Sequence, residues 1–343
     1  MVLKKRKALF AKLALSSAVA CGLMASNPAL AEDTVKVAAA AINVAHSAVA
    51  LGAVKPEIFG RHGIRLEVND LRGASPNCIA ALLSEAVDLC QVGTTTGTDA
   101  IAEGADLVAV AVLTGAVAEV VLSKKAADSL PVAADGPIEE RIKALKGLNI
   151  VTAAPGSANY TILDSLLGTV DLSISDLRYR TLGEVQAMIE GIRNNQIDGA
   201  FWVVGSLAPV IQDGTGVRWV SLARGDVEEY QQIPFVTVFA RRAWVEQNTD
   251  LVERIHAGYA DAIDELKNKP EESSKLIKDA YFPDLEQALW QDGYDQGRHA
   301  FLDGAKVKPE SWRASIALQE KTSGKDYSAA SFENAVLPAA QAK

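Results

Sequence analysis

Short apolar runs that alternate with helix-like segments are the feature of this sequence that most limits its fold. From residue 35 onward, runs rich in Val, Ile and Leu recur between Gly, Pro or Asn residues, and amphipathic stretches separate them. This alternation predicts a parallel or mixed sheet, because strands that run the same way need a helical crossover between them. In such sheets ligands bind beyond the carboxyl ends of the strands. We therefore expect an α/β protein whose functional residues follow its strands.

The stretch 146–160 is the best-defined unit of this kind. Residues 148–151 predict a buried strand, Pro155-Gly156 predicts a loop, and Ser157 or Asn159 can cap a helix that ends near Gly168. The first N–H groups of a helix have no partner within it, and with the helix dipole they attract an anion or a polar group. An ordinary crossover has the same pattern, so this unit alone does not establish a binding site.

The strand and helix pattern occurs twice, which predicts two lobes. Asp88 and Asp198 each stand just before a strand, after similar helices. We interpret residues 32–120 as the first part of lobe 1 and residues 121–233 as lobe 2. Residues 234–343 then contain a strand that returns to lobe 1, followed by helices. A chain of this length also favours two lobes over one core.

The first 31 residues have the composition of a secretory signal peptide. Residues 4–7 are basic, an apolar run covers residues 13–25, and Ala29-Leu30-Ala31 fits a cleavage site. The apolar run is too short for a transmembrane anchor, which needs about 18 residues or more. A lipoprotein anchored at Cys21 is an alternative, although the leucine that usually precedes such a cysteine is missing. We expect a cleaved, periplasmic protein.

Charge and cysteine content narrow the functional class. Without residues 1–31 and their five basic side chains, 29 basic and 43 acidic residues leave a net charge of −14, which argues against nucleic acid as a partner. An oxidising compartment permits a bridge between Cys78 and Cys90, but their places at a helix start and in the next strand argue against it. The sequence leaves this question open. The four histidines and these cysteines show no metal-ligand spacing, so we expect no metal and no cofactor.

Several segments together resemble the substrate-binding proteins of ABC importers of the nitrate/sulfonate/taurine type. The segments are 81–88, 100–107, 145–147, 155–157 and 197–200. The resemblance implies a two-lobed type II periplasmic-binding-protein fold, in which each lobe is a mixed, mainly parallel sheet flanked by helices. It also implies a ligand cleft between the lobes and a permease in the inner membrane as partner. We expect a monomer. The family often has Gly where this chain has Glu85 and Asn195; since Glu tolerates a left-handed conformation poorly, the first of these two loops is expected to differ.

Candidate ligand-binding residues follow the predicted strands. Arg72 could pair with a carboxylate or sulfonate through two hydrogen bonds. The indole of Trp202 could cover the apolar part of a ligand. For each candidate, capping, turn formation or core packing is an alternative role. The full set is Asn43, His46, Arg72, Thr94, Thr95, Ser157, Ala158, Asn159 and Trp202.

These residues favour a small organic anion as ligand, either a sulfonate or an aliphatic or aromatic carboxylate. We expect the protein to capture this anion by hinge closure and to deliver it to an ABC importer. The receptor of a tripartite carboxylate transporter is an alternative, as is a binder of a neutral pyrimidine-type thiamine precursor. An enzyme is not expected, because the sequence contains no Gly-x-Ser-x-Gly, His-Glu-x-x-His or Gly-x-x-x-x-Gly-Lys motif.

Overall fold

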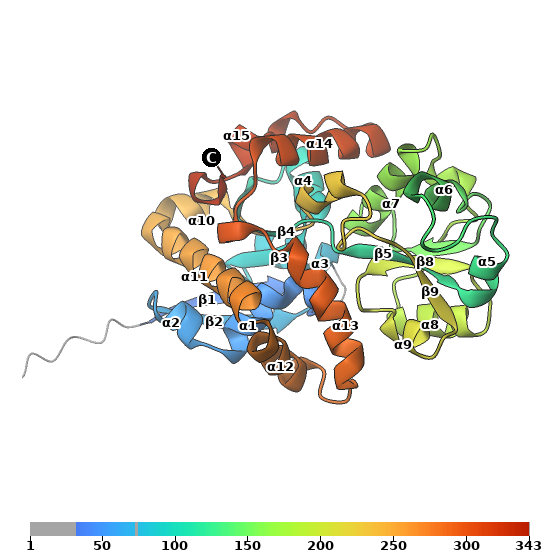
Figure 1. Cartoon of the computed structure of the whole chain (residues 1–343). Coiled ribbons are helices and arrows are strands. Elements are labelled where there is room, and N and C mark those ends of the chain that lie inside the picture. The colour runs from blue at the N-terminus through green and yellow to red at the C-terminus, as the bar shows by residue number, and fades with distance from the viewer. Residues whose placement is uncertain (1–31, 73–74, 343) are drawn as a thin grey trace, which may run out of the picture. The chain divides into compact units, whose positions relative to one another are not determined.

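The computed structural model describes residues 32–72 and 75–342. The predicted signal peptide lies outside these residues. The described part of the chain contains two five-stranded sheets, with helices packed on both (Figure 1). We call the first sheet and its helices the first lobe, and the second sheet and its helices the second lobe. Among the residues described, no helix is both long and apolar enough to cross a membrane.

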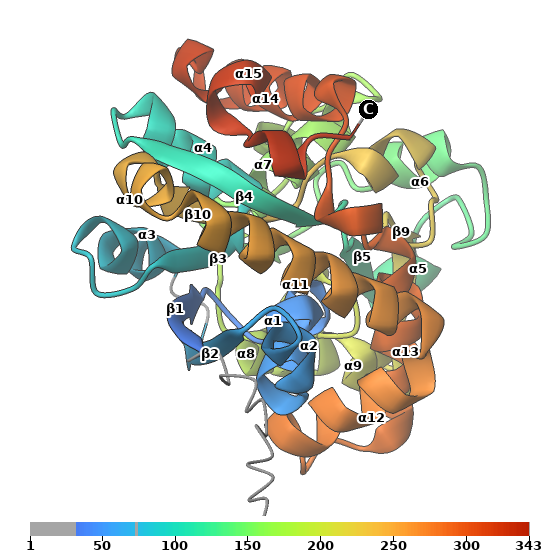
Figure 2. The same ribbon diagram turned by 90° about the vertical axis from the view of Figure 1, so that its left-hand side faces the viewer.

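The first sheet has the strand order β2-β1-β3-β10-β4, in which β10 is antiparallel to both of its neighbours. Its strands β3, β4 and β10 are buried along almost their whole length, as a sheet covered on both faces requires, whereas the edge strand β2 alternates between apolar and polar residues. Figure 2 shows α11 (Thr249–Asn268) crossing this sheet beside α1 (Ser47–Val54). The strands are β1 (Asp33–Ala39), β2 (Ile64–Asp70), β3 (Leu89–Gly93), β4 (Leu107–Thr114) and β10 (Val236–Arg241).

The second sheet has the order β7-β6-β8-β5-β9, and here β5 is the antiparallel strand. Its strand β5 begins at Ala118, three residues before the predicted start of lobe 2 at residue 121. Both sheets are thus mixed and mainly parallel, as predicted. The strands are β5 (Ala118–Ser123), β6 (Ile150–Thr152), β7 (Arg180–Thr181), β8 (Gly199–Val203) and β9 (Gly216–Ser221).

Two chain segments cross between the sheets, one from β4 to β5 and one from β9 to β10. They lie against each other: the Phe235 N–H donates to the Thr114 carbonyl at 2.8 Å, and the Ala116 N–H donates to the Tyr230 carbonyl at 3.3 Å. A Cβ on Gly115 would lie 1.7 Å from the Gln231 carbonyl oxygen, so only glycine permits this approach. The two paired crossovers are the chain segments that join the two sheets, and a pair of this kind can act as a hinge.

The helices distribute over both lobes. Within the second lobe, α7 (Ala158–Gly168) follows β6, as predicted, and α8 (Val185–Arg193) precedes β8. The C-terminal helices α13 (Gln287–Gly297) and α14 (Pro309–Ser323) contact elements of both lobes, including α9 and α7 of the second. Their apolar stripes predicted helices but could not predict which sheet they cover. The remaining helices are α2 (Glu57–Gly60), α3 (Ser75–Leu83), α4 (Thr94–Ala102), α5 (Lys124–Asp128), α6 (Ile138–Lys143), α9 (Ala208–Gln212), α10 (Arg242–Gln247), α12 (Pro270–Tyr281) and α15 (Phe332–Ala335).

A disulfide joins Cys78 of α3 to Cys90 of β3. The geometric objection raised from the sequence is therefore wrong. Helix α3 packs directly on β3, which brings the two Cα atoms to 5.6 Å, within the ordinary range for a disulfide.

Candidate functional site

Two neighbouring cavities lie between the lobes. The first, of about 670 Å³, contains the start of α7, and we call it the α7 cavity. The second, of about 810 Å³, contains Arg72, and we call it the Arg72 cavity. Both are lined by Ala41, Asn43, Gly183 and Trp202. Trp202 is half-buried at the boundary between them, where its indole is available to both.

The start of α7 forms one wall of the α7 cavity. Ser157, one of the two predicted caps, is the N-cap, and its Oγ accepts a hydrogen bond from the Tyr160 N–H at 3.2 Å. The N–H groups of Ala158 and Asn159 have no acceptor within the described residues. These two donors and the helix dipole favour negative charge or an oxygen acceptor in the cavity. Asn159 is also 9% exposed, and its Oδ1 has no hydrogen-bond partner in the described ranges.

His46 and Asn43 form the opposite wall, in the first lobe. Asn43 caps the 3₁₀ turn η1 (Val44–His46), and its Oδ1 accepts hydrogen bonds from the Ala45 N–H at 3.0 Å and from His46 Nδ1 at 3.1 Å. Because a backbone N–H donates to this atom, it is the amide oxygen, and Nδ1 of the ring must carry a proton. Burial lowers the pKa of His46 to about 4, so the ring is neutral at pH 7. Its Nε2 is therefore an acceptor, and no donor reaches it within the part of the chain described.

The structure does not place Thr94 and Thr95 on either cavity wall. Helix α4 begins at Thr94, so both threonines lie in its first turn. Thr94 and Thr95 are consequently buried, and the Thr94 hydroxyl is 2.8 Å from that of Thr237 in β10. Thr96, which the sequence analysis did not select, lines the α7 cavity instead.

An acidic side chain missed by the sequence analysis also lines the α7 cavity. Asp99 of α4 accepts a hydrogen bond from the Tyr327 hydroxyl through Oδ1. Its Oδ2 lies 3.4 Å from the position that a Cβ on Gly156 would occupy, directly before the α7 N-cap. Burial raises the pKa of Asp99, while the Tyr327 hydroxyl and Lys325 act in the opposite direction. Lys325 itself is paired with Glu103 at 2.6 Å. More than 200 residues of sequence separate the acidic side chains of this cluster from Lys325 and Tyr327, and no sequence motif links the two segments.

Arg72 lines the other cavity. It follows β2 with a left-handed φ of 52°, and its N–H donates to Asp70 Oδ1 at 2.9 Å. Phe282 and Trp290 also line this cavity, and their stacked rings have centroids 4.8 Å apart. Arg72 and Ser157 thus line different cavities, which share Ala41, Asn43, Gly183 and Trp202.

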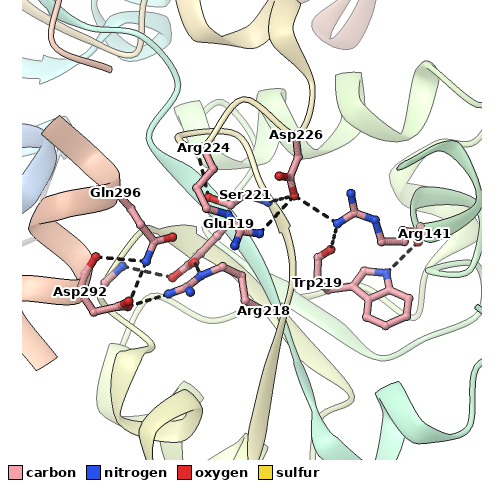
Figure 3. Close-up of polar contacts among 10 residues, drawn as sticks. Glu119, Arg141, Arg218, Trp219, Ser221, Arg224, Asp226, Asp292 and Gln296 are labelled. Carbon is pink, nitrogen blue, oxygen red and sulfur yellow. Dashed lines mark hydrogen bonds and ion pairs between the residues drawn. The ribbon is translucent and has the colours of Figure 1, made fainter. Parts of the chain in front are cut away.

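A buried polar network supports the loop after β8 (Figure 3). Glu119 of β5 is fully buried and accepts hydrogen bonds from the Gly205 N–H at 3.1 Å and from Arg218 Nε at 2.6 Å. Arg218 also donates to Asp292 of α13 at 2.7 Å, which ties α13 to the second sheet. Burial raises the pKa of Glu119, and Arg218 and the Gly205 N–H oppose that shift. Gly205 lines the Arg72 cavity, so this network positions part of its wall.

No group of three or more His, Cys, Asp or Glu side chains within residues 32–72 and 75–342 has the geometry of a metal site. The residues that line the two cavities offer hydrogen bonds, charged groups and apolar contact.

Solved structures with the same architecture are two-lobed periplasmic binding proteins. The periplasmic aliphatic sulphonate binding protein SsuA from Escherichia coli matches with a TM-score of 0.66 and 16% identity, over 84% of this chain and 91% of that chain. The alkanesulfonate-binding protein SsuA from Xanthomonas axonopodis pv. citri, bound to MOPS, matches with a TM-score of 0.64 and 17% identity, over 84% of this chain and 91% of that chain. The periplasmic nitrate-binding protein NrtA from Synechocystis PCC 6803 matches with a TM-score of 0.56 and 15% identity, over 77% of this chain and 69% of that chain. These likenesses confirm the predicted fold.

The model of the NMT1-like family matches residues 30–279, and the chain belongs to this family. No curated protein matches the chain in a sequence search.

Proposed function

We propose that this protein is a periplasmic solute-binding protein that captures a small organic anion between its lobes and delivers it to an ABC importer. The observation that carries the proposal is the start of α7: Ala158 and Asn159 line a cavity between the lobes, and their N–H groups have no acceptor in the described residues. The sulfonate- and nitrate-binding proteins of the same fold support this ligand class and the transport role.

Closure follows from the position of the α7 cavity. Its walls come from the first lobe through Asn43 and His46 and from the second through α7 and Trp202. A ligand that contacts both walls binds the closed arrangement more tightly than the open one and so shifts the population toward it. The paired crossovers at Gly115 supply the axis, and a permease of the inner membrane would recognise the closed surface. We propose that the protein acts as a monomer and as a binder, without catalysis.

A proline substitution tests the role of the α7 amides. Ala158→Pro removes one N–H donor, and proline is tolerated at the first position of a helix. The preceding Ser157 has φ −84° and ψ 154°, the extended conformation that a residue before proline adopts. The matched control is Gln287→Pro at the start of α13, where Glu286 has φ −59° and ψ 138°.

The measurement is the thermal unfolding midpoint of ligand-stripped protein against sulfonates, carboxylates, nitrate and neutral pyrimidines. A ligand at a hundredfold excess over Kd stabilises the folded state by about 2.7 kcal/mol. We expect one class of organic anion to raise the midpoint, Ala158→Pro to weaken its binding about tenfold, and Gln287→Pro to leave binding unchanged. No shift with any anion, or full affinity in Ala158→Pro, would contradict the proposal.

A further inference from the structure

Buried aromatic side chains anchor helix α13 in the first lobe. Trp290 is 4% exposed, and its indole N–H donates to the Ser274 carbonyl of α12 at 3.0 Å. The hydroxyl of the fully buried Tyr294 donates to the Leu266 carbonyl of α11 at 3.1 Å. Both α11 and α12 pack on α1 of the first lobe. Because buried aromatic side chains dominate the packing energy of a core, α13 should move with the first lobe.

The contact of α13 with the second lobe has a different character. A Cβ on Gly293 would lie 2.6 Å from the Gly205 Cα, so two backbones meet here with no side chain between them. Arg218 Nη2 donates to Asp292 Oδ2 at 2.7 Å, and this is the only hydrogen bond between α13 and the second lobe in residues 32–72 and 75–342 (Figure 3). The Asp292 side chain is 43% exposed, and a pair exposed to this extent is only weakly stabilising. We call the glycine pair and this ion pair together the α13 contact.

One buried carboxylate positions the second-lobe half of the α13 contact. Glu119 accepts hydrogen bonds from the Gly205 N–H through Oε1 and from Arg218 Nε through Oε2. Since Glu119 belongs to β5, the Gly205 backbone and the Arg218 guanidinium are held on the second sheet as one unit. On α13, Gln296 Nε2 donates to Asp292 Oδ2 at 3.0 Å and restrains the carboxylate that pairs with Arg218. Each lobe therefore presents its half of the contact in a fixed arrangement.

The glycine at position 293 is explained by this contact and not by its helix. It lies inside α13, where alanine would be the more stable residue. Any side chain at this position would collide with the Gly205 backbone. Gly205 and Gly293 both line the Arg72 cavity, so the wall of this cavity passes from one lobe to the other where the two glycines meet.

We infer that α13 is a strap, which moves with the first lobe and closes the Arg72 cavity by docking on Gly205 and Arg218 of the second lobe. When the lobes rotate apart, the two glycines separate and the Arg218–Asp292 pair breaks. The α13 contact thus favours the closed arrangement even without a ligand, and it sets the closed fraction of the ligand-free protein. This inference rests on the lobe closure of the proposed function, but not on the identity or the charge of the ligand.

The distance between the lobes of the ligand-free protein tests the strap. Double electron–electron resonance measures it between spin labels on p-acetylphenylalanine, introduced at the exposed position 187 of α8 and position 253 of α11. We expect a closed and an open distance in the wild type. Gly293→Ala should lower the ratio of closed to open protein about tenfold or more, because its Cβ meets the Gly205 backbone. Asp292→Asn should lower it about threefold, because it removes the charge of a half-exposed pair.

Asp295→Asn is the matched control. Asp295 is a carboxylate of the same helix, and it accepts a hydrogen bond from Gln291 of α13 at 2.8 Å. This variant should leave the ratio of closed to open protein unchanged. An equal shift in Asp295→Asn would overturn the inference, as would a wild-type distance that neither Gly293→Ala nor Asp292→Asn changes.

Thermal unfolding separates a strap from a permanent structural contact. Gly293→Ala should keep or raise the unfolding midpoint, because alanine favours the helix and the open arrangement has room for its methyl group. A lowered midpoint without a change of distance would show that the contact never opens, which would overturn the inference. If Gly293→Ala does not fold, Asp292→Asn provides the test. Shifted distances in a protein that binds no organic anion would support the strap and contradict only the proposed ligand class.

Discussion

The two sheets have the same strand order, yet their antiparallel strands contain different chemistry. In the first lobe, β10 pairs with β3 so that Val236 is opposite Gly93 and Thr237 is opposite Val92. In the second, β5 pairs with β8 so that Ala118 is opposite Val203 and Glu119 is opposite Trp202. Thr237 and Glu119 thus hold equivalent positions.

Each of these two residues ties its strand to the segment after the neighbouring strand. Thr237 does so through the hydroxyl of Thr94, and Glu119 does so through the Gly205 N–H. Glu119 also accepts a hydrogen bond from Arg218 of β9. The same position is filled by a neutral pair in one lobe and by a buried ion pair in the other. The backbone topology therefore does not determine which kind of interaction forms at this position. The neutral pair and the buried ion pair should respond differently to substitution.

The largest expected effect comes from the buried ion pair. Arg218→Met leaves Glu119 without its cation in a fully buried site and should cost about 3–5 kcal/mol of unfolding free energy. Thr237→Val, at the equivalent position of the first lobe, should cost about 1 kcal/mol. Urea denaturation measures both values. The double variant Glu119→Gln/Arg218→Met should regain part of the loss, and equal costs in the two lobes would show that the ion pair is not distinctive.

Acid should weaken the first lobe through His46. The pKa of this ring falls from 6.5 to about 4 on folding, so the unfolded chain binds a proton between these pH values and the folded chain does not. This contribution to stability is therefore lost as pH falls from 6.5 toward 4, by about 3 kcal/mol in total. Denaturation midpoints at pH 7 and pH 4.5 should show a smaller acid-induced loss in His46→Gln than in the wild type. An identical loss in both proteins would contradict the assignment.

The repeated aspartates before β3 and β8 should differ in importance. Asp88 accepts a hydrogen bond from the Lys36 N–H at 2.8 Å. Asp198 accepts one from the Asn149 N–H at 2.7 Å and a second from Arg178 at 2.9 Å. We expect Asp198→Ala to cost about 2 kcal/mol and Asp88→Ala about 1 kcal/mol, since charged hydrogen bonds exposed to water are only moderately stabilising. A larger cost at Asp88, in the same denaturation experiment, would reverse this order.

The smallest expected effect concerns the left-handed residues before these aspartates. Glu85 has φ 63° and Asn195 has φ 52°, so the first loop takes the left-handed conformation too, and the expectation that it would differ was wrong. Its backbone bonds repeat those of the second loop, with Ala86 N–H to the Ala81 carbonyl and Gln196 N–H to the Gly191 carbonyl. Glu85→Gly should stabilise the protein by roughly 0.5–1 kcal/mol and Asn195→Gly by less, because Asn tolerates this conformation better. Thermal midpoints of the two variants would show whether the gain at Glu85 is the larger one.

The starts of α4 and α7 show why some site residues were predictable and others were not. Ser157 caps α7 by a local hydrogen bond, and this pattern is visible in the sequence. Helix α4 begins at Thr94 without a side-chain cap, because the Thr94 N–H donates to the Phe235 carbonyl and its hydroxyl contacts Thr237. Both partners are more than 140 residues away, and threonine has low helix propensity, so the local sequence pattern does not indicate this helix start.

The sequence by itself determined the alternation of strands and helices, the two mixed sheets and the cap of α7, because these depend on local propensity and on apolar periodicity. Only the tertiary structure decided which loops share a cavity. It separated Arg72 from the α7 start, brought Asp99 toward Gly156, joined Cys78 to Cys90 and buried Glu119 beside Arg218. These outcomes depend on how two lobes and several distant segments pack, and hydrogen bonds across such distances leave no periodic signal in the chain.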